Sequence, residues 1–247
     1  MQVEGADFVA MHVTDLARAD EFYGRTLGLA RNPNSSGERW VEYETGNVTL
    51  ALSMFGGTVA LRVPDVAEAR RELEGSGVEF VMDTFDSGVC HGAPFVDADG
   101  NHLLLHRRYA PLDAWSPPET EVQRTDFAMI VTSDRERALE FYGDTLGLPR
   151  QPNAHEDWPE FETGNLTLSV VGYEQIGRET FEPNTGAVAL RVPDVAASRE
   201  RLEGVGVEFR GETMDSGVCH LAVLSDPDGN RVFAHRRYAP FPDGTMP

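Results

Sequence analysis

The chain has 247 residues, with 41 acidic residues against 21 arginines and no lysine, and a formal net charge of −20. Such a charge repels phosphate backbones, so nucleic acid is excluded as an expected partner. No apolar run approaches the roughly 20 residues that cross a bilayer, and the N-terminus lacks the basic and long apolar segments of a signal peptide. We therefore expect a cytoplasmic protein that binds neither nucleic acid nor membranes.

The first predicted elements are a strand, a helix and a hairpin. Residues 7–13 alternate between two faces, with Phe8 and His12 on the same one. An amphipathic helix follows over residues 14–28, from a Thr/Asp cap to a terminal glycine. Two or three strands come next, including a hairpin around residues 44–47 (ETGN).

The same order of elements then recurs. Strands are predicted at 58–63, 78–84, 89–96 and 101–108, with a helix at 64–77 after the first of them. Asp65 caps this helix and Glu68 follows three residues later, which is the spacing of a capping box.

The chain is also duplicated. Three pairs of segments match: 21–29 with 140–148, 40–52 with 158–170, and 59–80 with 188–209. The repetition predicts two homologous halves, residues 1–110 and 124–240, joined by a Pro-rich acidic linker at 111–123 and followed by a tail at 241–247. Each half divides into two βαβββ modules, at 6–55, 57–108, 125–172 and 186–237.

Three segments carry a family resemblance: VTDLARADEFYGRTLGL, LRVPDVAEARRELEGSGVEF and DPDGN. They resemble the vicinal oxygen chelate (VOC) superfamily, which includes glyoxalase I, bleomycin-resistance proteins and extradiol dioxygenases. The resemblance implies an α+β fold in which four βαβββ modules form two tandem domains, with curled mixed sheets around cavities and helices on the outer faces. It does not specify a function, because this fold carries lyases, isomerases, dioxygenases and metal-free drug-binding proteins.

The resemblance also implies where a metal ion would bind. In metal-dependent members the ligands come from four strand positions, usually as His, Glu or Gln. Those positions fall on Phe8, Ala51, Thr58 and Leu104 in the N-terminal half and on Phe127, Ser169, Ala187 and Phe233 in the C-terminal half. Because only two weak hydroxyls are among them, no metal ion or other cofactor is predicted there.

Alternation from these positions predicts which side chains face the cavities. The predicted ligand-binding residues are Phe8, His12, Trp40, Glu42, Arg62, Leu104 and His106 in one half and Phe127, Trp158, Glu160, Arg191, Phe233 and His235 in the other. The tryptophans would stack on an aromatic or cationic ligand, or simply close the cavity. The arginines would hold a carboxylate ligand or pair with Glu42 and Glu160.

The motif DSGVCH occurs at residues 86–91 and again at 215–220, and it contains both cysteines. Alternation predicts that Cys90 shares the face of His106, whereas His91 faces away unless a bulge inverts it. The candidate catalytic residues are His106 and His235 as general bases and Cys90 and Cys219 as nucleophiles. The alternatives are strand-end histidines and buried thiols. The DADGN and DPDGN segments that follow are predicted hairpin turns and not calcium sites.

These observations favour a metal-free protein that binds a small organic molecule, for sequestration or resistance, or for lyase or isomerase chemistry. One alternative is a glyoxalase-like metalloenzyme with a divalent metal ion displaced to His12, Glu42 and His106, since two imidazoles and a carboxylate suffice for an open site. Another is a scaffold or stress protein without a ligand. We expect a monomer or weak homodimer, because a tandem chain satisfies internally the pairing that other superfamily members make across a dimer.

Overall fold

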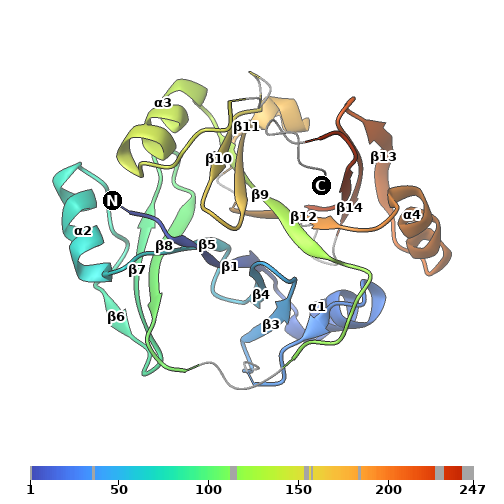
Figure 1. The fold of residues 1–247 in the computed structure, drawn as a ribbon, viewed down its shortest axis with the longest axis horizontal. Helices are drawn as coiled ribbons and strands as arrows, with labels where there is room; N and C mark the ends of the chain where they lie inside the picture. Colours follow the sequence, from blue (N-terminus) through green and yellow to red (C-terminus); the bar gives the residue numbers. More distant parts are fainter. Residues whose placement is uncertain are drawn as a thin grey trace. The chain divides into compact units, whose positions relative to one another are not determined.

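The computed structural model describes residues 2–34, 37–111, 116–152, 156, 158–182, 185–225 and 231–240. Its strands form two mixed sheets, one from each predicted half (Figure 1). Strands β5 and β8 run parallel in the first sheet, as do β12 and β15 in the second. The predicted α+β class with two mixed sheets is confirmed.

The first sheet has the order β2-β3-β4-β1-β5-β8-β7-β6. Its strands are β1 (Gly5–His12), β2 (Ala30–Arg31), β3 (Trp40–Glu44), β4 (Thr49–Ser53), β5 (Thr58–Arg62), β6 (Phe85–Asp86), β7 (Cys90–Val96) and β8 (His102–Arg108). The second sheet has the order β10-β11-β9-β12-β15-β14-β13. Its strands are β9 (Arg124–Thr132), β10 (Glu160–Glu162), β11 (Thr167–Gly172), β12 (Thr185–Arg191), β13 (Phe209–Asp215), β14 (Cys219–Ser225) and β15 (Arg231–Arg237).

The helices are short. The α-helices are α1 (Leu16–Asp20), α2 (Val66–Gly75), α3 (Arg135–Leu139) and α4 (Val195–Gly204), with π-helices η1 (Glu21–Thr26) and η2 (Glu140–Thr145) and a 3-10 helix η3 (Tyr173–Ile176). Within the described ranges, none of them has the length and apolar character needed to span a membrane.

Contacts between residues group the chain into two compact units. Unit 1 comprises Met1–Ala10, Gly57–Ala114 and Ala128–Gly186, and unit 2 comprises Met11–Gly56, Trp115–Phe127 and Ala187–Pro247. The sheets follow the sequence halves, whereas each unit takes one module from each half. Strands β1 and β9 therefore contribute to both units, and the domain boundaries predicted at residues 110 and 124 stay predictions.

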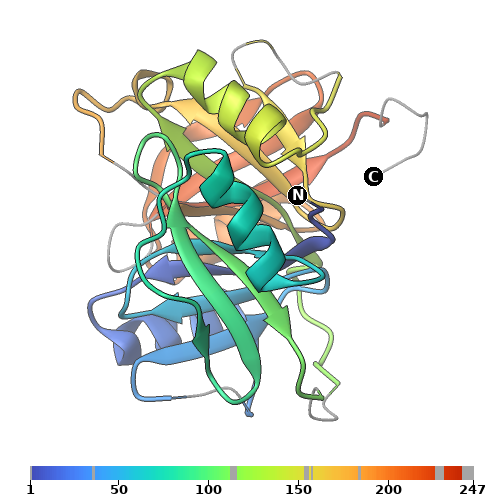
Figure 2. The same ribbon diagram turned by 90° about the vertical axis from the view of Figure 1, so that its left-hand side faces the viewer.

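In unit 1, helix α2 packs on the β7–β8 hairpin, as Figure 2 shows. Its N-terminus is capped by Asp65, whose side chain accepts a hydrogen bond from the backbone N–H of Glu68 at 2.9 Å. Its buried Leu73 belongs to the same core as Leu103 and Leu105, which are fully buried on β8. The helix predicted at residues 64–77 and its cap are confirmed, with the helix itself at Val66–Gly75.

The helix predicted at residues 14–28 has two parts in the structure. Only α1 is α-helical, and the chain then widens into η1, where the backbone N–H of Leu27 bonds five residues back to Phe22 at 2.9 Å. The wider turn buries Tyr23 beside Tyr43, with ring centroids 6.2 Å apart. An amphipathic pattern does not show this change, because the π-helical part has only six residues and is too short to display a period of its own.

The strand predicted at residues 78–84 is wrong as a continuous element. Its counterpart β13 is continuous, but the first half has only a bridge at Phe80 and the two-residue β6. Strand β7, which would pair with the predicted strand, has Pro94 where the equivalent strand β14 has Val223, so β7 lacks one backbone N–H donor. In β13 a register shift is accommodated at Gly211, which has a φ of +71°, whereas the first half has Met82 at that place.

The DADGN segment forms the predicted hairpin turn. Asp97 accepts hydrogen bonds from the backbone of Asp99 at 2.9 Å and from that of Asn101 at 2.8 Å. Its other carboxylate oxygen accepts from the buried hydroxyl of Tyr142 at 2.8 Å. The equivalent DPDGN turn at residues 226–230 lies outside the described residues.

Candidate functional site

Asp7 is the extra residue of a β-bulge in β1. Residues 6 and 8 pair with consecutive residues of β5, so Asp7 has no partner in the ladder. A bulge redirects the side chain that it carries. As a result, both Asp7 and the adjacent Phe8 contact His106 on β8, although strict alternation would place them on opposite faces.

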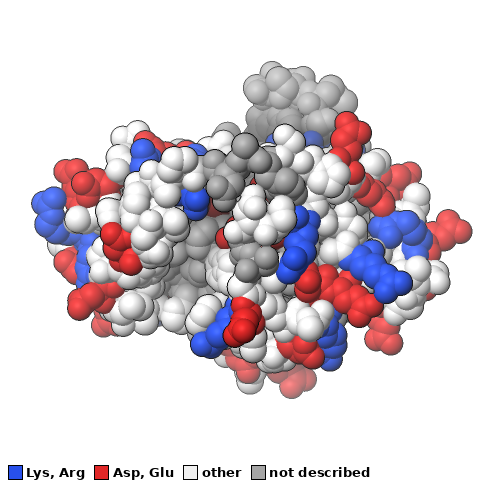
Figure 3. Space-filling model, turned by 90° about the horizontal axis from the view of Figure 1, so that it is seen from below, with Lys and Arg blue, Asp and Glu red and all other residues white. Residues whose placement is uncertain are grey.

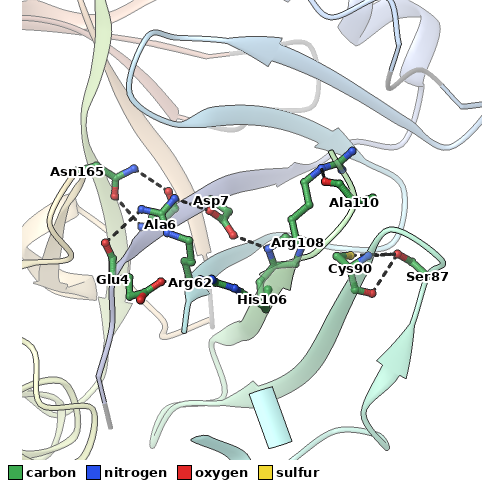
Figure 4. Close-up of polar contacts among 11 residues, drawn as sticks. Glu4, Ala6, Asp7, Arg62, Ser87, Cys90, His106, Arg108, Ala110 and Asn165 are labelled. Carbon is green, nitrogen blue, oxygen red and sulfur yellow. Dashed lines mark hydrogen bonds and ion pairs between the residues drawn. The ribbon is translucent and has the colours of Figure 1, made fainter. Parts of the chain in front are cut away.

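The bulge is held from two sides within unit 1 (Figure 4). The side-chain amide of Asn165 accepts a hydrogen bond from the backbone N–H of Ala6 at 2.7 Å and donates to its carbonyl at 2.8 Å. The guanidinium of Arg62 donates to Oδ1 of Asp7 at 3.0 Å and to the carbonyl of Glu4 at 3.2 Å. The carboxylate of Asp7 is therefore oriented before any ligand binds.

His106 is buried and bound to this carboxylate. Its Nδ1 donates to Oδ2 of Asp7 at 2.6 Å, and its ring meets that of Phe8 edge-on, with centroids 5.4 Å apart. Burial lowers the pKa of His106, but its hydrogen bonds to Asp7 and Cys90 outweigh that effect and raise the pKa to about 9. The imidazole is therefore protonated at neutral pH.

Cys90 begins strand β7 at the end of a tight turn. The turn requires Gly88 at a φ of +83°, and Ser87 places its hydroxyl 3.1 Å from the sulfur. Hydrogen bonding to His106 lowers the pKa of the Cys90 thiol, partial burial opposes this, and Ser87 and the charge of Arg108 add to the lowering. Cys90, His106 and Asp7 thus form a continuous chain of thiol, imidazole and carboxylate.

The second half builds the same arrangement within unit 2. Nδ1 of His235 donates to Oδ2 of Asp126 at 2.5 Å, and Arg191 donates to Oδ1 at 2.9 Å. Ser216 lies 3.1 Å from the sulfur of Cys219. Burial lowers the pKa of His235, but Asp126 and Cys219 raise it to about 9. Burial raises the pKa of Cys219, but its hydrogen bonds to His235 and Ser216 outweigh this and the pKa is lowered.

The supporting contacts are duplicated too. The side chain of Asn47 accepts from the backbone N–H of Thr125 at 2.9 Å and donates to its carbonyl at 2.8 Å, next to Asp126. The ring of Phe127 meets His235 edge-on, with centroids 5.6 Å apart. Both ETGN hairpins therefore end in an asparagine that holds the backbone beside a site aspartate.

His91 belongs to a different cluster from Cys90. Its ring packs at a tilt against that of Tyr109, with centroids 5.0 Å apart, and its Nε2 lies 3.5 Å from Asp86. The second half has the equivalent cluster of His220, Tyr238 and Asp215. The expectation that Cys90 shares a face with His106 while His91 does not is confirmed.

The structure corrects the predicted arginine partners. Arg62 binds Asp7 and not Glu42, and Arg191 binds Asp126 and not Glu160. In the first half, the reason is that the bulge brings Asp7 from the neighbouring strand to Arg62.

The remaining predicted residues lie elsewhere on the strands. In unit 2, Nε1 of Trp40 donates to Glu42 at 2.7 Å, both side chains are half-buried, and His12 is exposed. Trp158 is also half-buried, and Glu160 accepts from Ser169 at 3.3 Å. Leu104 and Phe233 are buried.

The residues at the superfamily's metal positions do not fit a metal ion. Phe8 and Phe127 present rings to the histidines, and Ala51, Leu104, Ala187 and Phe233 are buried apolar residues. The Thr58 hydroxyl is buried with no hydrogen-bond partner, but one hydroxyl is a poor ligand by itself. Across the described residues, which include His12, Glu42 and His106, no three His, Cys, Asp or Glu side chains are grouped to hold a metal ion.

Two hollows lie away from these clusters. A cavity of about 300 Å³ in unit 1 is lined by residues that follow α2 and β7 and by Phe141 and Thr145 of η2, and by none of the predicted site residues. A hollow of about 20 Å³ in unit 2 includes Phe233 in its wall. That volume is close to that of one water molecule.

Comparison with known proteins finds a family match in the C-terminal half of the chain. Residues 124–233 match the Glyoxalase/Bleomycin resistance protein/Dioxygenase superfamily. This match lies within the C-terminal half of the chain. The resemblance seen in its sequence motifs is thereby confirmed, and the internal duplication extends the same module order to the N-terminal half.

Relatives and structural neighbours agree with this assignment. A lactoylglutathione lyase from Pseudomonas putida is 25% identical over 149 residues, which cover 47% of this chain and 86% of that protein. The Mn(II)-bound glyoxalase from Novosphingobium aromaticivorans superposes with a TM-score of 0.70 at 13% identity, over 99% of this chain and 90% of that one. Homoprotocatechuate 2,3-dioxygenase from Arthrobacter globiformis has a TM-score of 0.70 at 17% identity, over 99% and 84% of the two chains. At these identities the two structural likenesses show the shared fold.

Sequence reasoning missed Asp7 and Asp126. Both precede the phenylalanine at a family metal position, in a DF pair that occurs in each half. Their duplication was a usable signal, because the two halves differ at many other positions of this strand. Strict alternation along the strand would place both aspartates on the face opposite to the histidines.

Proposed function

We propose that the protein binds a small organic molecule without a metal ion, on the sheet faces that present Phe8 with His106 and Phe127 with His235. The observation that carries the proposal is the replacement of metal ligands by aromatic and aliphatic side chains beside buried Asp–His pairs. Apolar walls with a few oriented polar groups are typical of small-molecule sites. We further propose a cytoplasmic monomer or weak homodimer.

The Asp–His pairs also suit proton transfer. A protonated imidazole held by Asp7 or Asp126 can donate a proton to a carbonyl or alkoxide oxygen of a bound ligand. The two curated relatives are named lactoylglutathione lyases, which supports lyase chemistry. The proposal therefore includes lyase or isomerase chemistry in which these imidazoles supply the proton.

The first prediction tests binding and metal together. Protein purified without chelator should contain no stoichiometric metal ion, and small aromatic or carbonyl compounds should raise its Tm, because a ligand of the folded state stabilises it. His106→Gln and His235→Gln should reduce these shifts. The matched controls His91→Gln and His220→Gln should not, since those imidazoles contact Tyr109 and Tyr238.

Elemental analysis and thermal-shift assays give a clear decision. Stoichiometric Zn, Ni, Fe or Mn would replace this proposal with the metal-dependent alternative that the Mn(II)-bound neighbour suggests. Absence of any thermal shift across a broad library would favour a scaffold without a ligand.

A further inference from the structure

We propose that Cys90 and Cys219 are nucleophilic thiolates, each activated by an imidazole and a carboxylate, and that they form covalent adducts with electrophilic small organic molecules. The inference rests on the proposed function, because the electrophile would occupy the same sheet faces. It adds the chemical class of the ligand and the atom that reacts with it.

The geometry of the first site supplies the activating groups in order. Register places Gly92 opposite His106, and Cys90 lies two residues before Gly92 on the same face of β7. The imidazole is in turn held by Asp7 through Nδ1 at 2.6 Å, which leaves Nε2 for the sulfur. A nucleophilic sulfur, an imidazolium that stabilises its thiolate and a carboxylate that orients the imidazolium are the parts of an activated thiol.

The charged groups around the sulfur act in one direction. His106 and Arg108 on β8 both lower the pKa of the Cys90 thiol, and Ser87 in the turn adds a hydrogen bond, while partial burial opposes them. The pKa of Tyr109 is raised mainly by its hydrogen bond to Asp86, and the charge on Cys90 raises it further.

The second site repeats this environment. His235, Ser216 and Arg237 lower the pKa of the Cys219 thiol, against the effect of burial. The pKa of Tyr238 is likewise raised mainly by its hydrogen bond to Asp215, and also by the charge on Cys219.

The duplication argues that the arrangement is maintained as a unit. The distance from imidazole to carboxylate is 2.6 Å in one copy and 2.5 Å in the other, and the distance from serine to sulfur is 3.1 Å in both. The surrounding sequence has diverged: β6 and β13 differ in length, and Pro94 replaces Val223. Fold constraints alone need only a small residue at the cysteine positions, not a hydrogen-bonded thiol.

The sulfur atoms are placed for reaction. Both cysteines are half-buried, free of disulfides, and located at strand ends beside the exposed Val89 and Val218. The rings of Phe8 and Phe127 lie against the activating imidazoles, which suits an uncharged organic ligand. A partly exposed, electropositive setting is the usual environment of a reactive cysteine.

The reaction is an addition that balances without a further reagent. The thiolate of Cys90 adds to the β-carbon of an α,β-unsaturated carbonyl compound and forms one C–S bond. The π electrons move towards the carbonyl, and the imidazolium of His106 gives the proton that the α-carbon takes up. The adduct contains every atom of both reactants, and neither is oxidised or reduced.

The experiment is the pH profile of alkylation by limiting N-ethylmaleimide, itself an α,β-unsaturated carbonyl compound, followed by intact mass. Cys219→Ser isolates the first thiol and Cys90→Ser isolates the second. The midpoint of each rate profile should lie below that of the same chain unfolded in urea. A lowering of one pKa unit gives about tenfold more thiolate at low pH, reduced to about threefold in rate by its weaker nucleophilicity.

Matched variants decide whether the imidazole is responsible. In the Cys219→Ser background, His106→Gln and Asp7→Asn should move the midpoint up towards the unfolded value, whereas His91→Gln should leave it unchanged. In the Cys90→Ser background, His106→Gln should not move the Cys219 midpoint, because that thiol is bound to His235 in the other unit.

Two results would overturn the inference: folded and unfolded midpoints that coincide, or equal effects of His106→Gln and His91→Gln. Should His106→Gln fail to fold by circular dichroism, the comparison of the folded and unfolded Cys219→Ser chain decides alone. Failure here leaves the thermal shifts of the proposed function intact, since reversible binding needs no thiolate, whereas loss of those shifts would overturn the proposed function.

Discussion

At the scale of single residues, Asp7 shows how one inserted position changes the chemistry of a strand. Its carboxylate binds Arg62 through one oxygen and His106 through the other. Alternation correctly placed Phe8 and His106 on a common face, but it could not place Asp7 there, because a bulge breaks the two-residue period locally. The face on which His106 lies was therefore predictable from the sequence, and its contact with Asp7 was not.

We predict that His106 and His235 stay protonated at neutral pH. Burial lowers each pKa, but the aspartate and cysteine partners raise it to about 9. NMR titration of the imidazole Cε1–H signals should show two histidines with midpoints near pH 9. Asp7→Asn should lower the midpoint of His106 and leave that of His235, which is bound to Asp126. Two midpoints at the ordinary histidine value would contradict the prediction.

The same pKa values make stability depend on pH. The unfolded imidazole has a pKa of 6.5, so its protonation stabilises the fold fully below that pH, and the contribution is lost as the pH rises towards 9. The lowered thiol pKa acts in the opposite sense, so the measurement belongs in a chain carrying both Cys90→Ser and Cys219→Ser. Because each cysteine contributes to the raised imidazole pKa, the free energy of unfolding of that chain in urea titrations should fall over a narrower range that starts near pH 6.5, and Asp7→Asn should reduce the fall.

At the scale of elements, the DSGVC turns have a structural role that explains much of their repetition. In the first, Asp86 accepts from the backbone of Gly88 at 2.8 Å and from the hydroxyl of Tyr109 at 2.6 Å. The same turn delivers a cysteine to one face of the next strand and a histidine to the other. Some residues of the motif therefore stabilise the turn and others belong to the candidate site. The sequence alone could not show which residue has which role.

Helix capping yields a prediction at this scale. Asp65→Ala removes the acceptor for the N–H of Glu68 and should lower the free energy of unfolding by about 1 kcal/mol in urea titrations. Asp194→Ala should cost a similar amount, since it caps α4 by the same contact to Ala197 at 2.9 Å. Asp83→Ala, an exposed loop aspartate, is the control and should change stability by less than about 0.5 kcal/mol. Equal losses in all three variants would refute the capping role.

At the scale of the whole molecule, the net charge of −20 is the dominant global property. The face seen in Figure 3 intermingles acidic and arginine side chains. Elsewhere in the chain, Arg25 and Glu21 form an exposed ion pair at 3.2 Å. Exposed pairs of this kind contribute little, whereas the excess of like charge destabilises the compact state.

Salt should therefore stabilise the protein. Raising NaCl from about 0.05 to 0.5 M shortens the Debye length and screens the mutual repulsion of the acidic residues, so Tm should rise. Differential scanning calorimetry checks this, with an uncharged osmolyte at equal osmolality as the control for general solvent exclusion. A fall in Tm would mean that the exposed ion pairs outweigh the net repulsion.

The sequence by itself determined the order of the elements, the duplication, the superfamily resemblance and the apolar character of the metal positions, because these depend on local periodicity and on matching segments. Only the tertiary structure decided that Asp7 and Asp126 join the two candidate sites, since a distant asparagine and an arginine on the next strand hold each of them, together with a bulge at Asp7. The same holds for the thiols: chain order separates Cys90 from His106 by 16 positions, and only the pairing of β7 with β8 brings sulfur and imidazole together.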